Sequence, residues 1–128
     1  MHHAVGDTFT LVKECDRYRP IYYAAASGDF NPIHLDPEVA ALAGLGRPIL
    51  HGLCTYGWAT ECFLNYLGDP GKVKKLRVRF SRPVAIEDTI TFTGTVTSVL
   101  NGVVTAEITA TNQRGEAVLK GVVAEGAV

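Results

Sequence analysis

An aspartate and a histidine stand five positions apart in the segment 27–34, which reads SGDFNPIH. Gly28 and Pro32 disfavour a continuous helix, so the segment can fold as a loop that returns His34 towards Asp29. An Asp and a His that share one water molecule could add water to a carbon–carbon double bond, or remove it, because one group takes a proton while the other gives one. The pair is therefore a candidate acid/base site.

Each member of this pair also has an ordinary explanation when it is taken singly. Asp29 could be a turn aspartate that binds nearby backbone N–H groups, and His34 could be a structural histidine. Asn31 lies between them and carries an amide that could hold either side chain in place. The combination favours chemistry more than either residue does alone.

A second candidate feature is His51-Gly52, where a long amphipathic run begins. A backbone N–H in the first turn of a helix lacks an acceptor within the helix and carries the positive end of the helix dipole. The Gly52 N–H could therefore bond a thioester oxygen as it becomes an enolate. Alternatively, Gly52 only allows close packing at the start of the helix. Thr60, two turns further on, either bonds its own helix or brings a hydroxyl to the site.

The elements that must position these residues change in character near residue 70. Before that point the spacing of apolar residues, capping residues and breakers predicts a short strand and three helices. Asp16 and Asp36 are the expected N-caps of the first two helices. The third helix is indicated by the three- and four-residue spacing of Leu53, Tyr56 and Thr60, and we expect it to be buried on most sides. The predicted elements are a strand near residues 8–12 and helices from Asp16 or Arg19 to Ala26, from Asp36 to Gly44, and from Gly52 to Leu67.

After residue 70 the sequence alternates with the two-residue period of strands. Asn101-Gly102 is a strong hairpin signal, a second hairpin is expected at 113–115, and Pro83 should end a strand or mark a sheet edge. We expect strands at about 75–80, 90–98, 104–110 and 118–124. The chain is therefore predicted to be α+β, with an antiparallel sheet of at least three long strands that wraps the helix from Gly52.

The composition describes a protein of ordinary size without an unusual charge. A chain of 128 residues can form one domain, and 12 basic against 13 acidic residues give no reason to expect nucleic acid or an anionic membrane as partner. The three cysteines form no CxxC pair, which argues against disulfides and zinc. No leader opens the chain and no apolar run approaches the ~20 residues of a membrane span, so we expect a cytoplasmic protein.

Two further groups of residues have alternative interpretations. Cys54 lies near His51, but no third residue is evident to orient the histidine, and a cysteine in a buried helix usually packs. A run of basic residues could be the solvated side of a sheet, or it could meet the phosphates of coenzyme A or the acidic surface of an acyl carrier protein. These residues are Lys72, Lys74, Lys75, Arg77, Arg79 and Arg82.

The segment from Tyr23 to His34, with Ala40 six residues later, resembles the signature of the MaoC-like (R)-specific enoyl-CoA hydratases and 3-hydroxyacyl dehydratases. The likeness extends through residues 44–52 and 79–84 and covers most of the chain. It implies a single MaoC-like hot-dog domain over residues 1–128, with an antiparallel sheet of five or six strands curled round a long central helix. It also implies a homodimer with the two sheets joined edge to edge, and a heterodimer is the alternative.

The resemblance assigns roles to the candidate residues. It places Asp29 and His34 on the catalytic pair and Gly52 on the oxyanion donor. Supporting positions are Ser27, Asn31, His51 and Thr60, the last where members often carry serine. Arg79 and Arg82 are the candidates for coenzyme A phosphates. The sequence departs from the family's pattern at two places. Ala26 replaces a branched residue, which concerns packing, and Ile86-Glu87 replaces Pro-Gly, which concerns a turn.

The implied activity is that of a hydro-lyase acting reversibly on trans-2-enoyl and (3R)-3-hydroxyacyl thioesters. Asp29 would take a proton from water, His34 would protonate C2, and Gly52 N–H would hold the enolate oxygen. The alternative is that Asp29 and His34 exchange these two proton transfers, because both touch the same water. Asp29 is expected to be buried in a helix-lined tunnel, which would make it a better base. No metal or redox cofactor is expected, and coenzyme A enters as part of the substrate. Alternatives are a hot-dog acyl-CoA thioesterase and an acyl-binding subunit of a heteromeric dehydratase.

Overall fold

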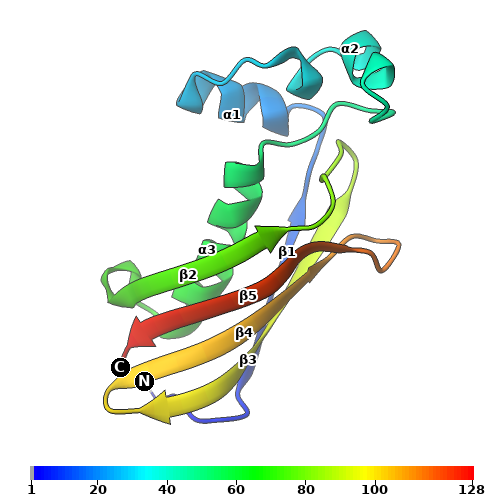
Figure 1. The fold of residues 1–128 in the computed structure, drawn as a ribbon. Coiled ribbons are helices and arrows are strands. Elements are labelled where there is room, and N and C mark those ends of the chain that lie inside the picture. The colour runs from blue at the N-terminus through cyan, green and yellow to red at the C-terminus, as the bar shows by residue number, and fades with distance from the viewer. Residues whose placement is uncertain (1) are drawn as a thin grey trace.

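The computed structural model describes residues 2–128, which form one antiparallel sheet of five strands, a long helix against it, and a group of short helices beyond one end (Figure 1). The strand order is β1-β3-β4-β5-β2. The predicted α+β class is confirmed, and the elements in chain order are β1 (Thr8–Glu14), α1 (Arg19–Ser27), η1 (Pro32–His34), α2 (Pro37–Leu42), α3 (Gly52–Leu67), η2 (Pro70–Lys72), β2 (Val73–Phe80), β3 (Thr89–Leu100), β4 (Val103–Thr111) and β5 (Ala117–Ala127).

The three longest strands form the predicted meander. The turn between β3 and β4 is Asn101-Gly102, and both residues adopt positive φ, at 53° and 75°, as this hairpin turn requires. β5 continues antiparallel to β4, and β2 pairs with β5. β1 and β2 are thus the edge strands, which agrees with the edge predicted from Pro83.

The core lies between α3 and the inner face of the sheet. Trp58, Cys62 and Phe63 of α3 are buried there together with alternate residues of β3, β4 and β5. The prediction that α3 is buried on most sides is wrong for one stripe, since Leu53 is 68% exposed. Apolar residues occur almost all round this helix, so their spacing did not define the face that the sheet covers.

Residues 16–50 form a group that we call the overhang, which holds α1, η1 and α2 beyond the end of the sheet (Figure 1). α1 begins at Arg19 with Tyr18 as its N-cap residue, so the predicted cap at Asp16 is wrong. Asp16 instead accepts the Tyr18 N–H in the turn before the helix, at 2.9 Å. The cap predicted at Asp36 is confirmed, because its carboxylate accepts the Glu38 N–H.

The turn at residues 85–88 ties the overhang to the sheet. Its Glu87 has φ of 73°, which glycine would adopt without strain, so the sequence departure at this position does fall in a turn. The Ile86 N–H donates to the Pro48 oxygen of the overhang, and Cys15, which follows β1, pairs with the turn through backbone bonds to Glu87 and Asp88. None of the helices among the described residues is long and apolar enough to cross a membrane.

Candidate active site

The loop after α1 is shaped by short polar side chains. Gly28 ends the helix with φ of 79°, and the Ser27 hydroxyl accepts the Asp29 N–H at 3.1 Å. Asp29 Oδ1 accepts the Asn31 N–H, and Asn31 Oδ1 accepts the Ile33 N–H, both at 3.2 Å. These bonds satisfy a backbone that cannot form a regular element, and they turn the chain so that residue 34 returns towards residue 29.

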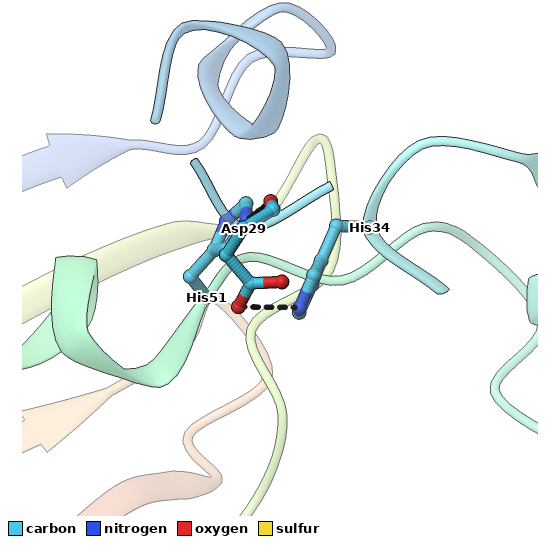
Figure 2. Close-up of side chains that lie close together, drawn as sticks. All are labelled: Asp29, His34 and His51. Carbon is cyan, nitrogen blue, oxygen red and sulfur yellow. Dashed lines mark hydrogen bonds and ion pairs between the residues drawn. The ribbon is translucent and has the colours of Figure 1, made fainter. Parts of the chain in front are cut away.

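The structure brings Asp29 and His34 together, as the sequence predicted (Figure 2). Asp29 Oδ2 lies 3.9 Å from His34 Nε2, close enough for one water oxygen to hydrogen bond to both. His34 Nδ1 lies 2.7 Å from the backbone oxygen of Ile49. Because a carbonyl can only accept, Nδ1 carries the hydrogen, and Nε2 is left to work with Asp29.

The two side chains differ in exposure. The His34 side chain is 9% exposed, whereas that of Asp29 is 55% exposed. The expected burial of Asp29 in a tunnel is therefore wrong for the single chain. The short loop carries Asp29 at the rim of the overhang, and no element of this chain among residues 2–128 covers it.

His51 packs directly behind the pair. Its Nε2–H donates to the backbone oxygen of Asp29 at 2.8 Å, which fixes its own hydrogen on Nε2. Its ring stacks on His34 with centroids 3.8 Å apart and planes inclined by 22°, and the ring of Tyr23 covers it at 4.7 Å. Its Nδ1 is buried and has no hydrogen-bond partner among the described residues. His51 thus holds both the Asp29 backbone and the His34 ring.

Asp29, His34 and His51 also offer three potential metal-ligand atoms within 4.8 Å of one another. The lone pairs of imidazole nitrogens lie in the ring planes, and the planes of two stacked rings do not meet at one nearby ion. The arrangement therefore suits proton transfer better than chelation. The absence of a metal stays a prediction.

A cleft of about 310 Å³ opens beside His34. Gly52, the first residue of α3, lines it, and so do Thr55 and Phe80. As the first helical residue, Gly52 has no intrahelical acceptor for its N–H. A Cβ at this position would lie 3.2 Å from the Phe80 ring, so glycine also permits the close approach of β2. The lining residues are His34, Ile49, Leu50, Gly52, Thr55, Phe80, Ser81, Arg82, Pro83, Val84 and Val118.

Other predicted site residues lie elsewhere. The Thr60 hydroxyl donates to the Tyr56 backbone oxygen at 3.0 Å and does not line the cleft. Arg82 lines the cleft, whereas Arg79 lines a separate hollow with Arg77. Burial raises the pKa of the Cys54 thiol, which favours packing over a nucleophilic role.

Three residues of the site were not predicted from the sequence. Tyr23 supports His51, and Thr55 and Phe80 line the cleft. Thr55 lies one helical turn after His51, so the spacing of α3 offered a signal for it. Phe80 and Tyr23 offered none, because their positions depend on how β2 and α1 meet the start of α3.

Comparison with known proteins extends this picture. Residues 13–118 match the family model described as "MaoC like domain". The chain is 43% identical over 72 residues to a probable enoyl-CoA hydratase 2 of Dictyostelium discoideum, covering 55% of this chain and 24% of that protein. It is 45% identical over 67 residues to 3-hydroxyacyl-thioester dehydratase Y of Mycobacterium tuberculosis, covering 50% and 23%. The matched segments thus cover less than a quarter of the length of each of these two relatives.

Two solved structures are similar over nearly their full length. An (R)-hydratase from A. caviae involved in PHA biosynthesis has a TM-score of 0.88 and 27% identity, with 98% of both chains covered. The ChsH1-ChsH2 complex of Mycobacterium tuberculosis has a TM-score of 0.88 and 25% identity, with 99% of both chains covered. These likenesses confirm the predicted hot-dog fold. With the match over residues 13–118, they establish that this chain belongs to the MaoC-like domain family.

Proposed function

We propose that the chain is a hydro-lyase that adds water reversibly to trans-2-enoyl thioesters and forms (3R)-3-hydroxyacyl thioesters. The observation that carries the proposal is the approach of Asp29 Oδ2 to His34 Nε2, at 3.9 Å, beside the cleft that Gly52 lines. Relatives named enoyl-CoA hydratase and 3-hydroxyacyl-thioester dehydratase support the reaction class. The likeness to an (R)-hydratase supports the (3R) product.

In the hydration direction a water lies between Asp29 and His34. Asp29 accepts a proton from it, and the water oxygen forms a bond to C3 as the electrons of the double bond move to C2. His34, protonated at Nε2, then delivers a proton to C2. Proton return from Asp29 to His34 through the next water restores the pair, and dehydration follows the same steps in reverse.

Negative charge collects on the thioester oxygen during addition. As the first residue of α3, Gly52 has no acceptor within the helix for its N–H, which can donate to that oxygen and carries the positive end of the helix dipole. A donor aimed at a developing oxyanion lowers the barrier because it needs no reorganisation when the charge appears. The proposed roles therefore require both the 27–34 loop and the start of α3.

His51 acts as a positioning residue in this proposal. Its hydrogen bond holds the Asp29 backbone at 2.8 Å, and its ring face supports His34 at 3.8 Å. It leaves both reacting atoms, Oδ2 and Nε2, free to meet water. Coenzyme A as part of the substrate, a cytoplasmic location and a homodimer stay predictions. Heteromeric assembly is the alternative to a homodimer, since one structural relative is a complex of two different chains.

The test is turnover of a short trans-2-enoyl-CoA by the Asp29→Asn and His34→Gln variants. Each substitution keeps the size of the side chain and removes its acid/base function. We expect kcat to fall by roughly 10²–10⁴ in each, as is typical for the loss of general acid–base catalysis. The loss of enoyl absorbance measures the rate, and chiral analysis of the product measures stereochemistry.

Circular dichroism should show that both variants keep the fold. Asp29 is exposed, and His34→Gln removes one hydrogen bond to the backbone, that from Nδ1 to the Ile49 oxygen. Near wild-type turnover in a folded Asp29→Asn or His34→Gln variant would exclude the pair from catalysis. Release of free thiol without loss of the enoyl group would instead identify a thioesterase.

A further inference from the structure

A second cavity, of about 250 Å³, adjoins the catalytic cleft. The two share Ile49, Arg82 and Pro83 in their linings. Two further arginines, Arg47 and Arg114, line only the second cavity. The cleft beside His34 therefore continues into a space with three guanidinium groups, which we call the arginine cavity. Its lining is completed by Gly44, Leu45, Ala85 and Asp88.

The three arginines come from separate parts of the chain. Arg47 belongs to the overhang, Arg82 to the connection after β2, and Arg114 to the turn between β4 and β5. Their side chains are 39%, 53% and 50% exposed, so each guanidinium is within reach of solvent and of a ligand. The three arginines are far apart in the sequence, and the tertiary fold brings them to one cavity.

A buried carboxylate orients two of these arginines. Asp88 Oδ1 lies 3.2 Å from Arg47 Nη2 and 3.4 Å from Arg114 Nη1, and it also accepts the Gln113 amide. Burial opposes ionisation of Asp88, but the bonds from Gln113 and the Ala85 N–H, with the charges of both arginines, keep its pKa below the usual value. The oxygens of Asp88 are occupied by these partners, so its main effect is to hold the guanidinium groups in place.

Two other carboxylates approach the arginines. Glu116 pairs with Arg82 at 3.3 Å and with Arg114 at 2.7 Å, while Glu87 lies 3.9 Å from Arg47. Neither glutamate lines the cavity. Each guanidinium has five N–H donors, and these pairs together with the Arg47 bond to the Ile86 oxygen use only part of them. The remaining donors match the oxygens of a phosphate, which arginine forks bind in a bidentate manner.

We propose that the arginine cavity binds a phosphate group of the arm that carries the acyl thioester, through Arg47, Arg82 and Arg114. The inference rests on the proposed function, since it requires the thioester to lie in the adjoining cleft. Coenzyme A and the prosthetic group of an acyl carrier protein both have a phosphate at the end of a pantetheine arm. This assignment replaces Arg79 with Arg47 and Arg114 as the partners of Arg82.

The test compares Arg82→Gln and Arg114→Gln with Arg79→Gln, which removes a neighbouring basic residue outside the cavity. Each variant is assayed with a short enoyl-CoA, with the corresponding enoyl-4′-phosphopantetheine and with enoyl-pantetheine, which has no phosphate. We expect Arg82→Gln and Arg114→Gln to raise KM for enoyl-CoA by roughly 10- to 100-fold, as for a lost hydrogen bond to a charged group. KM for enoyl-pantetheine should change less than about twofold, and kcat should be unchanged with either substrate.

The enoyl-phosphopantetheine identifies which phosphate is bound. A response like that of enoyl-CoA supports the phosphate next to pantetheine, whereas a response like that of enoyl-pantetheine would overturn the assignment, because the bound phosphate would not belong to the pantetheine arm. Equal KM changes with enoyl-CoA and enoyl-pantetheine would overturn the proposal, and so would a larger effect of Arg79→Gln. Retained circular dichroism and unfolding midpoint would show that Arg82→Gln, whose only side-chain partner among residues 2–128 is Glu116, is folded.

Calorimetric titration with coenzyme A and with pantetheine separates this proposal from the proposed function. Binding of coenzyme A by the wild-type protein that weakens in Arg82→Gln but not in Arg79→Gln supports the arginine cavity even without hydratase turnover. Equal affinity of all three proteins for coenzyme A would refute it even in an active hydratase.

Discussion

The sheet with α3 and the overhang are held together by different interactions. Between α3 and the sheet, large apolar side chains such as Phe63 and Phe92 are completely buried. In the overhang the buried residues are mostly small or polar, such as Ala24, Ala40 and His34. The overhang is fastened by hydrogen bonds, among them those from His34 to the Ile49 oxygen and from His51 to the Asp29 oxygen.

This difference explains where the chemistry lies. Polar groups that must meet water and substrate cannot be placed in a dry apolar core without a large desolvation cost. The overhang offers partly exposed positions, and its imidazole, that of His34, both bonds the Ile49 oxygen and is a candidate reacting group. Substitutions in the core should therefore change stability without changing the reacting groups, whereas substitutions in and next to the overhang should change stability and activity together.

The largest expected effect is on the core. Phe63→Ala removes a completely buried aromatic side chain next to Phe9, and we expect the free energy of unfolding to fall by roughly 3–5 kcal/mol. The matched change in the overhang, Phe30→Ala, removes a side chain that is 59% exposed and should cost about 0.5 kcal/mol or less. Urea unfolding followed by circular dichroism measures both values. Similar losses in the two variants would contradict the division into core and overhang.

The next largest effect is expected where the two regions meet, at Gly52. Proline is well tolerated at the first helical position, and the extended conformation of His51, with ψ of 134°, suits a residue before proline. Gly52→Pro should therefore keep the helix and remove the N–H, lowering kcat by roughly 10²–10³.

Gly52→Ala is the control for this change. It places the same Cβ near the half-exposed Phe80 ring, 3.2 Å away, but keeps the N–H. We expect it to retain most of the wild-type kcat for the enoyl-CoA. If both variants lost activity equally, crowding of Phe80 would account for the loss and the oxyanion role of Gly52 would be rejected.

The sheet and α3 could be predicted from local signals in the sequence. Asn101-Gly102 marked the hairpin, and the bounds of α3 followed from Gly52 and Gly68. The exposed stripe of α3 could not be predicted from the sequence, because Leu53 is as apolar as the residues of α3 that are buried. Which side of such a helix is covered depends on the sheet, and that is a property of the tertiary structure.

The candidate site was predictable where local signals mark its residues, as in the 27–34 loop and at Gly52, the first residue of α3. Asp29, Asn31 and His34 could be grouped because proline and glycine turn the chain between them. The stacking of His51 on His34, the support from Tyr23 and the arginine cavity depend on contacts between distant segments. The exposure of Asp29 also could not be foreseen, since a sequence motif does not state how far a loop lies from the core.

The smallest effect, and the most direct test of the link between stability and activity, is expected at His51. His51→Phe keeps an aromatic ring between Tyr23 and His34 but removes the hydrogen bond to the Asp29 oxygen. An unpaired backbone carbonyl costs roughly 1–3 kcal/mol where it is buried, and the loop would shift to relieve it. We expect a fall of about tenfold in kcat with little change in KM, because Asp29 would be displaced rather than removed.

His51→Gln retains an N–H donor but loses the ring, so it should disturb His34 more than Asp29. If His51→Phe showed wild-type kcat while its unfolding midpoint fell, the His51 bond would stabilise the overhang without placing Asp29, and the two properties would be as separable there as in the core.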